Sequence, residues 1–502
     1  MRRRDFLSSM SLVAGLVASR QACALAALVS KSILDYGAKP DGRTLNSKAI
    51  QRAIDDVFRA GGGTVNVPPG IFLTGRIELK SGVTLNLDAG CTLLGSKSIS
   101  DYNANSGIAG NAGENGRHLI FAVNAEDVVL SGSGRIDGQG PTFWEPSGKA
   151  PLSQDQQWAD VASHDLAVKK GGRPSPMLEF VNCTRLKIQD VQIENAPGWT
   201  LRIVNCDNVD IHGIDIKNPV NGPNTDGIDI TGCQNVTVSN CSVATGDDAI
   251  CLKSENPYGT EPRLLKNILV TNCHLTTCCN GFKLGTSSEG GFESITFSDS
   301  VVYNADVPYR ERVISGVALE VVDGGWIDGV IVKNIRMQRT RTPIFIRLGN
   351  RKHVHDYPQR GLRNVNIENV QATEALLASS ITGLQGMEVR NVTLSQISVN
   401  NVLQSHPEWV GRSVPEKENA YPEARMFGML PASGLYVRHV RDLRFNDLAF
   451  TAPRGESRPT IIFDDVVGAR LSKIQSSPIS GGMPVLLQDN SRDVQLVRSG
   501  AN

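Results

Sequence analysis

Short β-rich segments recur along most of this chain, and that repeat limits the possible folds more than any other feature. Examples lie at residues 128–132, 209–213, 236–240 and 268–272, and the copies return about every 25–35 residues. Asn or Asp often flanks a copy, as expected for turn positions. One such unit cannot bury an apolar face alone, but stacked parallel copies bury it continuously. The sequence therefore predicts an all-β fold, a right-handed parallel β-helix.

A many-stranded β-sandwich is the alternative fold. Sandwich strands usually return every 8 to 12 residues or so through hairpins, and Asn-Gly hairpin signals are scarce here. We therefore predict one β-helix domain over residues 31–500. Residues 46–60 instead carry apolar side chains at helical spacing, which predicts an amphipathic helix that caps the first coil. The proline-rich residues 405–431 are expected to form a long surface loop.

The first 26 residues are typical of an export signal. Arginines at positions 2 to 4 precede an apolar run that is too short to span a membrane, and small residues follow it. Arg3-Arg4-x-Phe6-Leu7 resembles a twin-arginine signal, with an ordinary secretory signal as the alternative. We therefore expect an exported protein, periplasmic or secreted.

Charge and hydropathy indicate which partners to expect. Lys and Arg number 51, Asp and Glu also number 51, and no later stretch is apolar enough to span a bilayer. We expect no nucleic-acid partner, no membrane partner and a monomeric chain.

Cysteines number ten, one of them within the predicted signal. Cys183, Cys206, Cys241 and Cys273 occupy similar places in successive repeats, which suits buried stacked thiols, with one or two disulfides as the alternative. No Cys-x-x-Cys pair with matching histidines occurs, so we predict no metal site.

Two acidic clusters are candidates for catalysis. Asp226 lies in residues 224–227, and Asp247 and Asp248 lie in residues 246–249, roughly one coil later. Neighbouring coils would bring the three carboxylates together, where like charges raise one pKa and create a proton donor beside an ionised base. An inverting glycosidase needs that combination. The alternative is that these aspartates only cap turns.

At these clusters the chain resembles the polygalacturonases, glycoside hydrolase family 28. Asn224-Thr225-Asp226 and Gly246-Asp247-Asp248 are similar to the first two signature motifs, and residues 35–42, 61–65 and 136–140 are similar to the opening of bacterial members. The resemblance implies a pectic polysaccharide or oligosaccharide substrate, an inverting mechanism and no cofactor. It implies that Asp247 is the general acid, that Asp226 and Asp248 activate water, and that Asn224 positions sugar hydroxyls or Asp226.

The later motifs of that family are altered in this chain. Asn280 stands at the histidine of Gly-His-Gly, Lys283 replaces a small polar residue, and Ala318 and Glu320 stand at the two cations of Arg-Ile-Lys. Two interpretations follow. Lys283 and Arg347 replace the missing cations, or the subsite takes a sugar other than a uronate, as in a rhamnogalacturonan or side-chain hydrolase. Asn224, Asn280, Lys283 and Arg347 are therefore the candidate substrate-binding residues.

Two other functions fit the same scaffold. A polysaccharide lyase would use the acidic cluster to hold calcium, and a non-catalytic glycan-binding surface protein would need no catalytic group. The long loops at residues 140–175 and 405–431 would favour exo action if they closed one end of the cleft.

Overall fold

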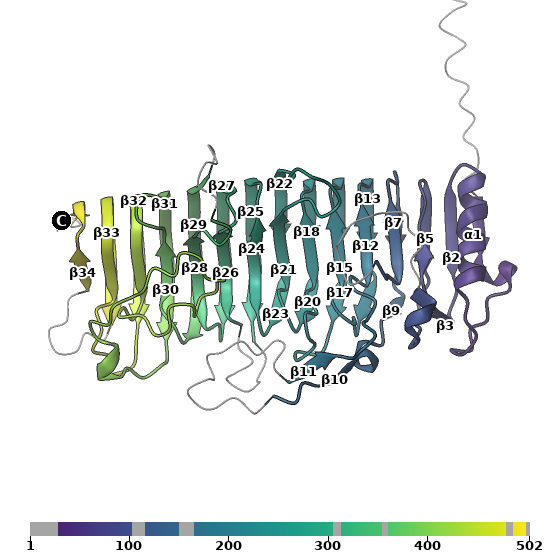
Figure 1. The fold of residues 1–502 in the computed structure, drawn as a ribbon, viewed down its shortest axis with the longest axis horizontal. Coiled ribbons are helices and arrows are strands. Elements are labelled where there is room, and N and C mark those ends of the chain that lie inside the picture. The colour runs from purple at the N-terminus through teal and green to yellow at the C-terminus, as the bar shows by residue number, and fades with distance from the viewer. Residues whose placement is uncertain are drawn as a thin grey trace, which may run out of the picture.

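The computed structural model describes residues 29–102, 116–149, 165–304, 313–353, 360–477 and 485–497. The predicted export signal, residues 1–26, lies outside these ranges. The described chain forms a long row of stacked coils, with α1 at one end and the C-terminal strands at the other (Figure 1). Strand β1 begins at Val29, close to the predicted domain start at residue 31.

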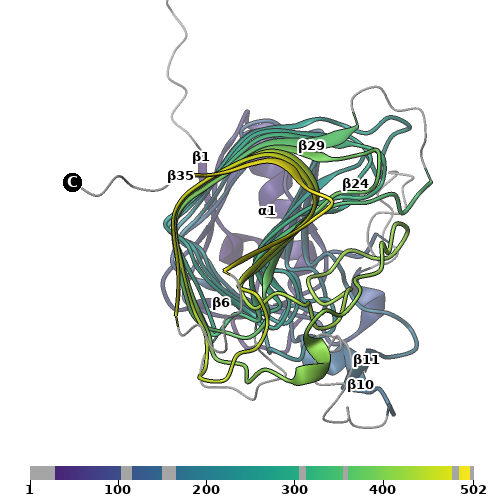
Figure 2. The ribbon, with the colours of Figure 1, turned by 90° about the vertical axis from the view of Figure 1, so that its left-hand side faces the viewer.

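The parallel β-helix predicted from the repeat is confirmed. Within the described residues, 33 strands belong to one sheet system, and every pairing in it joins parallel strands of successive coils, as Ile228 pairs with Ile250 and Ile250 with Phe282. Seen along the axis, the coils superimpose, and the antiparallel pair β10 (Trp144–Pro146) and β11 (Leu166–Val168) lies outside them (Figure 2).

One face of the solenoid, here called the site sheet, carries the acidic clusters at its strand starts. Its strands are β4 (Ile77–Glu78), β7 (Ile120–Val123), β12 (Leu178–Val181), β15 (Leu201–Val204), β18 (Ile228–Thr231), β21 (Ile250–Ser254), β24 (Asn280–Ser288), β26 (Ser315–Val321), β28 (Thr342–Leu348), β30 (Ser379–Thr382) and β34 (Leu486–Asp489), with the first parts of β32 (Leu435–Thr451) and β33 (Ile461–Ser477).

The other two faces complete each coil. The second contains β1 (Val29–Ser32), β2 (Gly63–Val67), β5 (Val83–Leu87), β8 (Val129–Ser131), β13 (Thr184–Gln189), β16 (Asp207–His212), β19 (Gln234–Ser239), β22 (Leu265–Thr271) and β35 (Arg492–Val497). The third contains β3 (Gly70–Thr74), β6 (Cys91–Gly95), β9 (Arg135–Asp137), β14 (Gln192–Glu194), β17 (Asp215–Lys217), β20 (Ser242–Thr245) and β23 (His274–Thr277). Both are continued by the long strands β25 (Gly291–Tyr303), β27 (Trp326–Gln338), β29 (Gly361–Ala375) and β31 (Val389–Asn401).

Stacked turns explain the abundance of asparagine. Asn235 and Asn267 both have positive φ, a conformation that Asn tolerates better than most residues. The Asn267 side-chain amide donates to the Asn235 side-chain oxygen of the preceding coil, at 3.0 Å. Each turn is thereby bonded to its neighbour, so successive coils keep the same register.

Helix α1 (Ser47–Arg59) covers the open end of the first coil, as predicted for residues 46–60. Ala49, Ile50, Ala53, Ile54 and Val57 are buried against the core. Residues 405–431 form the predicted loop and contain one short 3₁₀ turn, Pro407–Trp409. No helix of the described ranges is long and apolar enough to cross a membrane.

All nine cysteines of the described chain are buried free thiols. The Cys206 sulfur accepts a hydrogen bond from the Cys183 amide at 3.2 Å, and the Cys233 sulfur accepts one from the Cys206 amide at the same distance. Cys241 and Cys273 lie at a different corner of the coil, where their two thiols form a hydrogen bond. Buried stacked thiols are confirmed, but the expectation that Cys183, Cys206, Cys241 and Cys273 occupy similar places is wrong. In two separate columns, Cys183 and Cys206 stack with Cys233, and Cys241 stacks with Cys273.

Burial predicts that these thiols react only when the protein unfolds, because the thiolate must reach solvent to attack a reagent. Titration with an aromatic disulfide should label none of the nine in the native protein and all nine in denaturant. Rapid labelling of several thiols in native protein would contradict the buried columns.

Candidate active site

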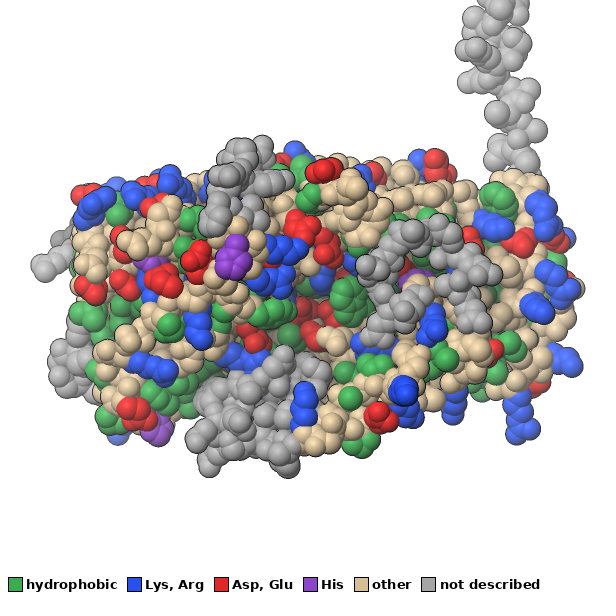
Figure 3. Space-filling model, viewed as in Figure 1, with side chains coloured by type: hydrophobic (Ala, Val, Ile, Leu, Met, Phe, Trp, Pro, Cys, Tyr) green, Lys and Arg blue, Asp and Glu red, His purple; other side chains and the backbone are tan. Residues whose placement is uncertain are grey.

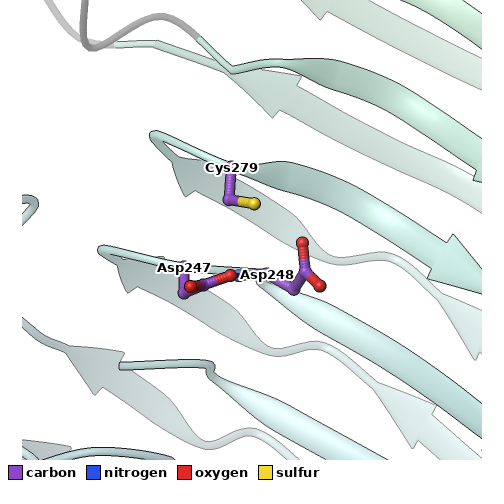
Figure 4. Close-up of side chains that lie close together, drawn as sticks. All are labelled: Asp247, Asp248 and Cys279. Atoms are coloured by element: carbon purple, nitrogen blue, oxygen red, sulfur yellow. Dashed lines mark hydrogen bonds between the residues drawn. The ribbon is translucent and has the colours of Figure 1, made fainter. Parts of the chain in front are cut away.

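The three aspartates lie in stacked turns just before strands of the site sheet. Asp226 precedes β18, and Asp247 and Asp248 precede β21 on the next coil. The Gly227 amide donates to the Asp248 carbonyl oxygen at 2.9 Å, which fixes the two turns side by side. Figure 4 shows the Asp247 and Asp248 side chains beside Cys279 of the following coil. In Figure 3, acidic and basic side chains gather in a hollow in the middle of this face.

Asp248 is held as a carboxylate. Its side chain is 4% exposed, and burial alone would raise its pKa. Lys283 Nζ lies 3.0 Å from one carboxylate oxygen, and Asn280 Nδ2 donates to the other at 2.7 Å. These contacts, together with the charge of Lys253, outweigh burial and lower the pKa of Asp248 to about 2.

Asp226 has the opposite environment. It is 4% exposed, and its Oδ1 has no hydrogen-bond partner among the described residues. Burial raises its pKa well above the usual range, and the nearby charges of Asp247 and Asp229 raise it further. The two buried aspartates therefore differ in acidity, because the surroundings favour the carboxylate form of Asp248 and the protonated form of Asp226.

Asp247 is the more open member of the cluster, and it is half-buried. Its Oδ1 accepts a hydrogen bond from the Asp248 amide at 2.8 Å, and its Oδ2 accepts one from Asn224 Nδ2 at 3.3 Å. Asn224 is exposed, so its side chain lies at the mouth of the site. The structure thus places both asparagines in the acidic cluster, although Asn224 bonds Asp247 instead of the predicted Asp226, and Asn280 bonds Asp248.

Lys283 lies between the carboxylates of Asp248 and Glu320. Its Nζ lies 3.9 Å from Glu320 Oε2, and both side chains are buried. Burial raises the pKa of Glu320 to about 8, although Lys283 opposes this effect. Glu320 is therefore mostly neutral at pH 7, so it does not present a full negative charge to a sugar carboxylate.

A Glu320→Gln variant tests this assignment through stability. The folded-state pKa of about 8 exceeds the ordinary value of 4.5. The proton on Glu320 therefore favours the folded state below about pH 4.5, and that contribution is lost as the pH rises through 8 or so. We expect equal melting temperatures for wild type and variant at about pH 5, and a more stable variant at about pH 9. An unchanged difference between the two pH values would contradict a neutral Glu320.

A second buried pair was missed by sequence reasoning. Lys253 of β21 contacts the Asp229 carboxylate of β18, and its Nζ lies 4.7 Å from the Trp199 ring centre. Lys253 also influences the pKa of Asp226 and of Asp248. Strand alternation was the available signal, because inward Ile250 and Leu252 place Cys251 and Lys253 on the outer face.

The structure shows the surroundings of two residues considered for the altered motif, Arg347 and Ala318. Arg347 is fully buried, and its guanidinium donates to the carbonyl oxygens of Glu416 and Lys417 at 2.8 and 3.1 Å. These contacts hold a loop and give no support to sugar binding by Arg347. Ala318 is also fully buried, in an apolar cluster with Phe345 and Phe427, so an arginine introduced there would meet packed side chains instead of substrate.

One group of side chains in the described part of the chain has a geometry that could hold a metal ion. Asp247, Asp248 and Cys279 each offer a ligand atom, and these atoms lie within 4.8 Å of one another. Lys283 already neutralises Asp248, which competes with a cation at that carboxylate. The absence of a metal requirement stays a prediction.

Comparison with known proteins agrees with this fold. A structure titled as a hyperthermoactive exopolygalacturonase from Thermotoga maritima aligns with a TM-score of 0.60 and 24% identity, over 74% of this chain and 87% of that one. A probable polygalacturonase of Vitis vinifera is 26% identical over 74% of each chain. The exo-poly-alpha-D-galacturonosidase of Dickeya chrysanthemi is 25% identical over 85% of this chain and 72% of its own length.

A carboxylate cluster on adjacent coils has the groups that acid–base cleavage of a glycosidic bond requires. The model of the glycosyl hydrolases family 28 matches residues 61–417. The chain belongs to this family and is a polygalacturonase-like glycoside hydrolase.

Proposed function

We propose that this enzyme hydrolyses a glycosidic bond of a pectic polysaccharide or oligosaccharide with inversion, using Asp226, Asp247 and Asp248. The observation that carries the proposal is the contrast between two carboxylates of one cluster. Asp248 is paired with Lys283 and Asn280, which lower its pKa, whereas the buried Asp226 has an oxygen without a hydrogen-bond partner among the described residues, and burial raises its pKa. General acid and base are thus present together at one pH, as inversion requires.

In the reaction, Asp247 donates its proton to the bridging oxygen while the bond from that oxygen to the anomeric carbon breaks. Water attacks that carbon from the opposite side, and Asp226 and Asp248 take up the proton that the water loses. In the free enzyme, burial raises the pKa of Asp226, and the nearby charge of Asp247 raises it further. The mechanism requires that Asp247 holds the proton and Asp226 is ionised once the substrate is bound.

Sugar hydroxyls have two candidate partners. Asn280 is buried and holds Asp248 through its amide nitrogen, while its Oδ1 has no hydrogen-bond partner among the described residues. A buried acceptor without a donor is costly, so a sugar hydroxyl at this oxygen would bind favourably. Asn224 offers a second polar contact at the entrance.

Pectic substrates other than plain galacturonan are the second candidate. The family's two cations are replaced by Ala318 and Glu320, and the nearby Lys283 is already paired with Asp248. These contacts favour a subsite that binds a neutral sugar, as in a rhamnogalacturonan or a pectin side chain. Lys283 remains the candidate for a carboxylate-binding residue if the substrate there is a uronate.

We further propose that the enzyme attacks chain ends, because a loop blocks the cleft beyond Lys283. Residues 405–431, here called the C-terminal wall, pack on the outer face of the site sheet, with Phe427 against Phe345. Arg347 and Arg438 donate to carbonyl oxygens at residues 414–417, which anchors the wall. Tyr421 of the wall is 57% exposed, and its ring centre lies 5.7 Å from Lys283 Nζ.

Product analysis separates hydrolysis from the two alternatives. A hydrolase releases reducing ends without ultraviolet-absorbing unsaturated uronates, and its rate should survive removal of divalent cations by a chelator. A lyase would produce unsaturated ends, and loss of activity with the chelator would favour its calcium-dependent mechanism. Absence of any cleavage across galacturonan and rhamnogalacturonan would favour a glycan-binding protein.

The rate should depend on pH as the cluster predicts. Asp248, with a pKa of about 2, stays ionised throughout the mildly acidic range. Because the pKa of Asp226 is raised, the cluster keeps a proton at pH values above the usual pKa of an aspartate, and it loses that proton as the pH rises further. We expect kcat/KM to be high in mild acid and to fall on the alkaline side. A rate that climbs steadily from about pH 4 to about pH 9 would contradict this protonation scheme.

We also propose that the chain is exported and acts as a monomer in the periplasm or outside the cell. The twin-arginine-like start of the sequence supports export, and the monomeric state stays a prediction. A fusion of residues 1–26 to a reporter that is active only after export tests the signal, with Arg3→Lys/Arg4→Lys as the control expected to abolish export.

A further inference from the structure

A second loop covers the site sheet on the other side of the aspartates. Residues 255–263, here called the N-terminal wall, connect β21 to β22 and turn back over earlier coils. Tyr258 packs against an apolar patch formed by Phe121, Val181 and Val204. Its hydroxyl donates to the buried Glu179 carboxylate at 2.8 Å.

Polar contacts fix this wall at both of its ends. Arg202 Nη2 donates to Glu255 Oε1 at 3.3 Å, and Asn205 Nδ2 donates to Asn256 Oδ1 at 2.9 Å. At the far end, Arg263 donates to both carboxylate oxygens of Asp207, at 3.0 and 3.2 Å. The wall is therefore held by side chains of the two coils that precede the aspartates.

Between the two walls, the outer face of three strands carries charged side chains, with the Trp199 ring near Lys253 and the Tyr421 ring near Lys283. These are β18, β21 and β24, and their outward side chains include Asp229, Lys253 and Lys283. Among the strands, the apolar clusters begin at Val204 of β15 on one side and at Ala318 of β26 on the other, and Cys279 in the turn before β24 also belongs to the second cluster. In Figure 1, teal and green loops lie in front of the solenoid on the two sides of β21 and β24.

The width of this gap limits the length of a bound sugar chain. Successive strands lie about 4.8 Å apart, so the four spacings from β15 to β26 span roughly 19 Å. The catalytic aspartates lie on successive coils, so a glycan that meets them runs along the solenoid and crosses the strands. A pyranose unit is about as long as one strand spacing, which leaves room for about three or four units.

We infer that the site is a pocket closed at both ends and that its substrate is a short pectic oligosaccharide of about three or four units. This inference rests on the proposed function and adds the substrate size. A long chain cannot lie across both walls, because each wall is anchored by buried apolar contacts and hydrogen bonds.

The test is a series of galacturonate oligosaccharides and matching rhamnogalacturonan fragments, from two units up to the polymer. We expect kcat/KM to peak at about three or four units and to be about tenfold or more lower for the polymer, per chain end, because a wall would have to open. Tyr258→Ala removes the apolar anchor and should raise the ratio of polymer to trimer rates by about tenfold. Tyr258→Phe keeps the ring and should preserve the wild-type length profile.

The outcomes separate this inference from the function beneath it. A wild-type enzyme that cleaves no pectic substrate refutes the proposed function, and the inference falls with it. Cleavage of polymer, at interior bonds or from its ends, at a rate per chain end that no oligosaccharide exceeds, overturns the closed pocket and leaves the function intact. If Tyr258→Ala does not fold, as circular dichroism would show, the wild-type length series alone decides.

Discussion

Replacing Asp247 by Asn should lower kcat by about 10²–10⁴-fold, the usual contribution of a general acid. Asparagine keeps the shape of the side chain and one acceptor oxygen for the Asp248 amide, but it has no proton of suitable acidity to give the leaving oxygen. Substrate binding should change little. Initial rates on the best oligosaccharide, measured for both enzymes over a range of concentrations, give kcat and KM separately.

Asp190→Asn is the matched control for that experiment. Asp190 is an exposed turn aspartate with positive φ, a conformation that Asn accepts, so activity and melting temperature should stay at wild-type values. Near wild-type turnover in Asp247→Asn would remove the general-acid role. Equal losses in both variants would point to damage to the fold.

Replacing Lys283 by Met should cost about 3–5 kcal/mol of folding stability, because breaking a buried ion pair leaves its partner charge unpaired. Lys283 is 3% exposed, and its Nζ is the cation nearest to Asp248 in the described site. Its loss should also raise the pKa of Asp248, so the acid limb of the rate profile should move to higher pH. Thermal unfolding and a pH series of kcat/KM measure the two effects.

Lys333→Met provides the comparison for that stability effect. Lys333 is exposed on β27, so its loss should change stability by about 0.5 kcal/mol or less. A Lys283→Met variant with the melting temperature of the wild type and the same kcat/KM profile on the acidic side would contradict this role. Lys283 would then not hold Asp248 in its ionised form.

Local patterns in the sequence were sufficient for the fold. Strand–turn repeats with Asn at the turns are short-range features, and they predicted the stacked coils, the helix over Ser47–Arg59 and the long C-terminal loop. The spacing of the two acidic clusters equals one coil, so it also placed Asp226 beside Asp247 and Asp248. These expectations required only that each repeat occupy the same place on successive coils.

Contacts between distant segments could not be predicted in that way. Arg347 looked available for a sugar, yet it binds carbonyl oxygens of a loop nearly 70 residues later. Ala318 matched a cation position by alignment, but that loop covers it with Phe427. The N-terminal wall depends on Tyr258 reaching Glu179, a contact across 79 positions that no local pattern records.

The anomeric configuration of the first product tests the central claim most directly. Proton NMR of a reaction run at high enzyme concentration records the new hemiacetal before it mutarotates. In the proposed mechanism, Asp226 and Asp248 activate a water that attacks directly, while Asp247 protonates the leaving oxygen. This mechanism predicts a product with inverted configuration. A product that first appears with retained configuration, or with an unsaturated end, would contradict the mechanism assigned to these three aspartates.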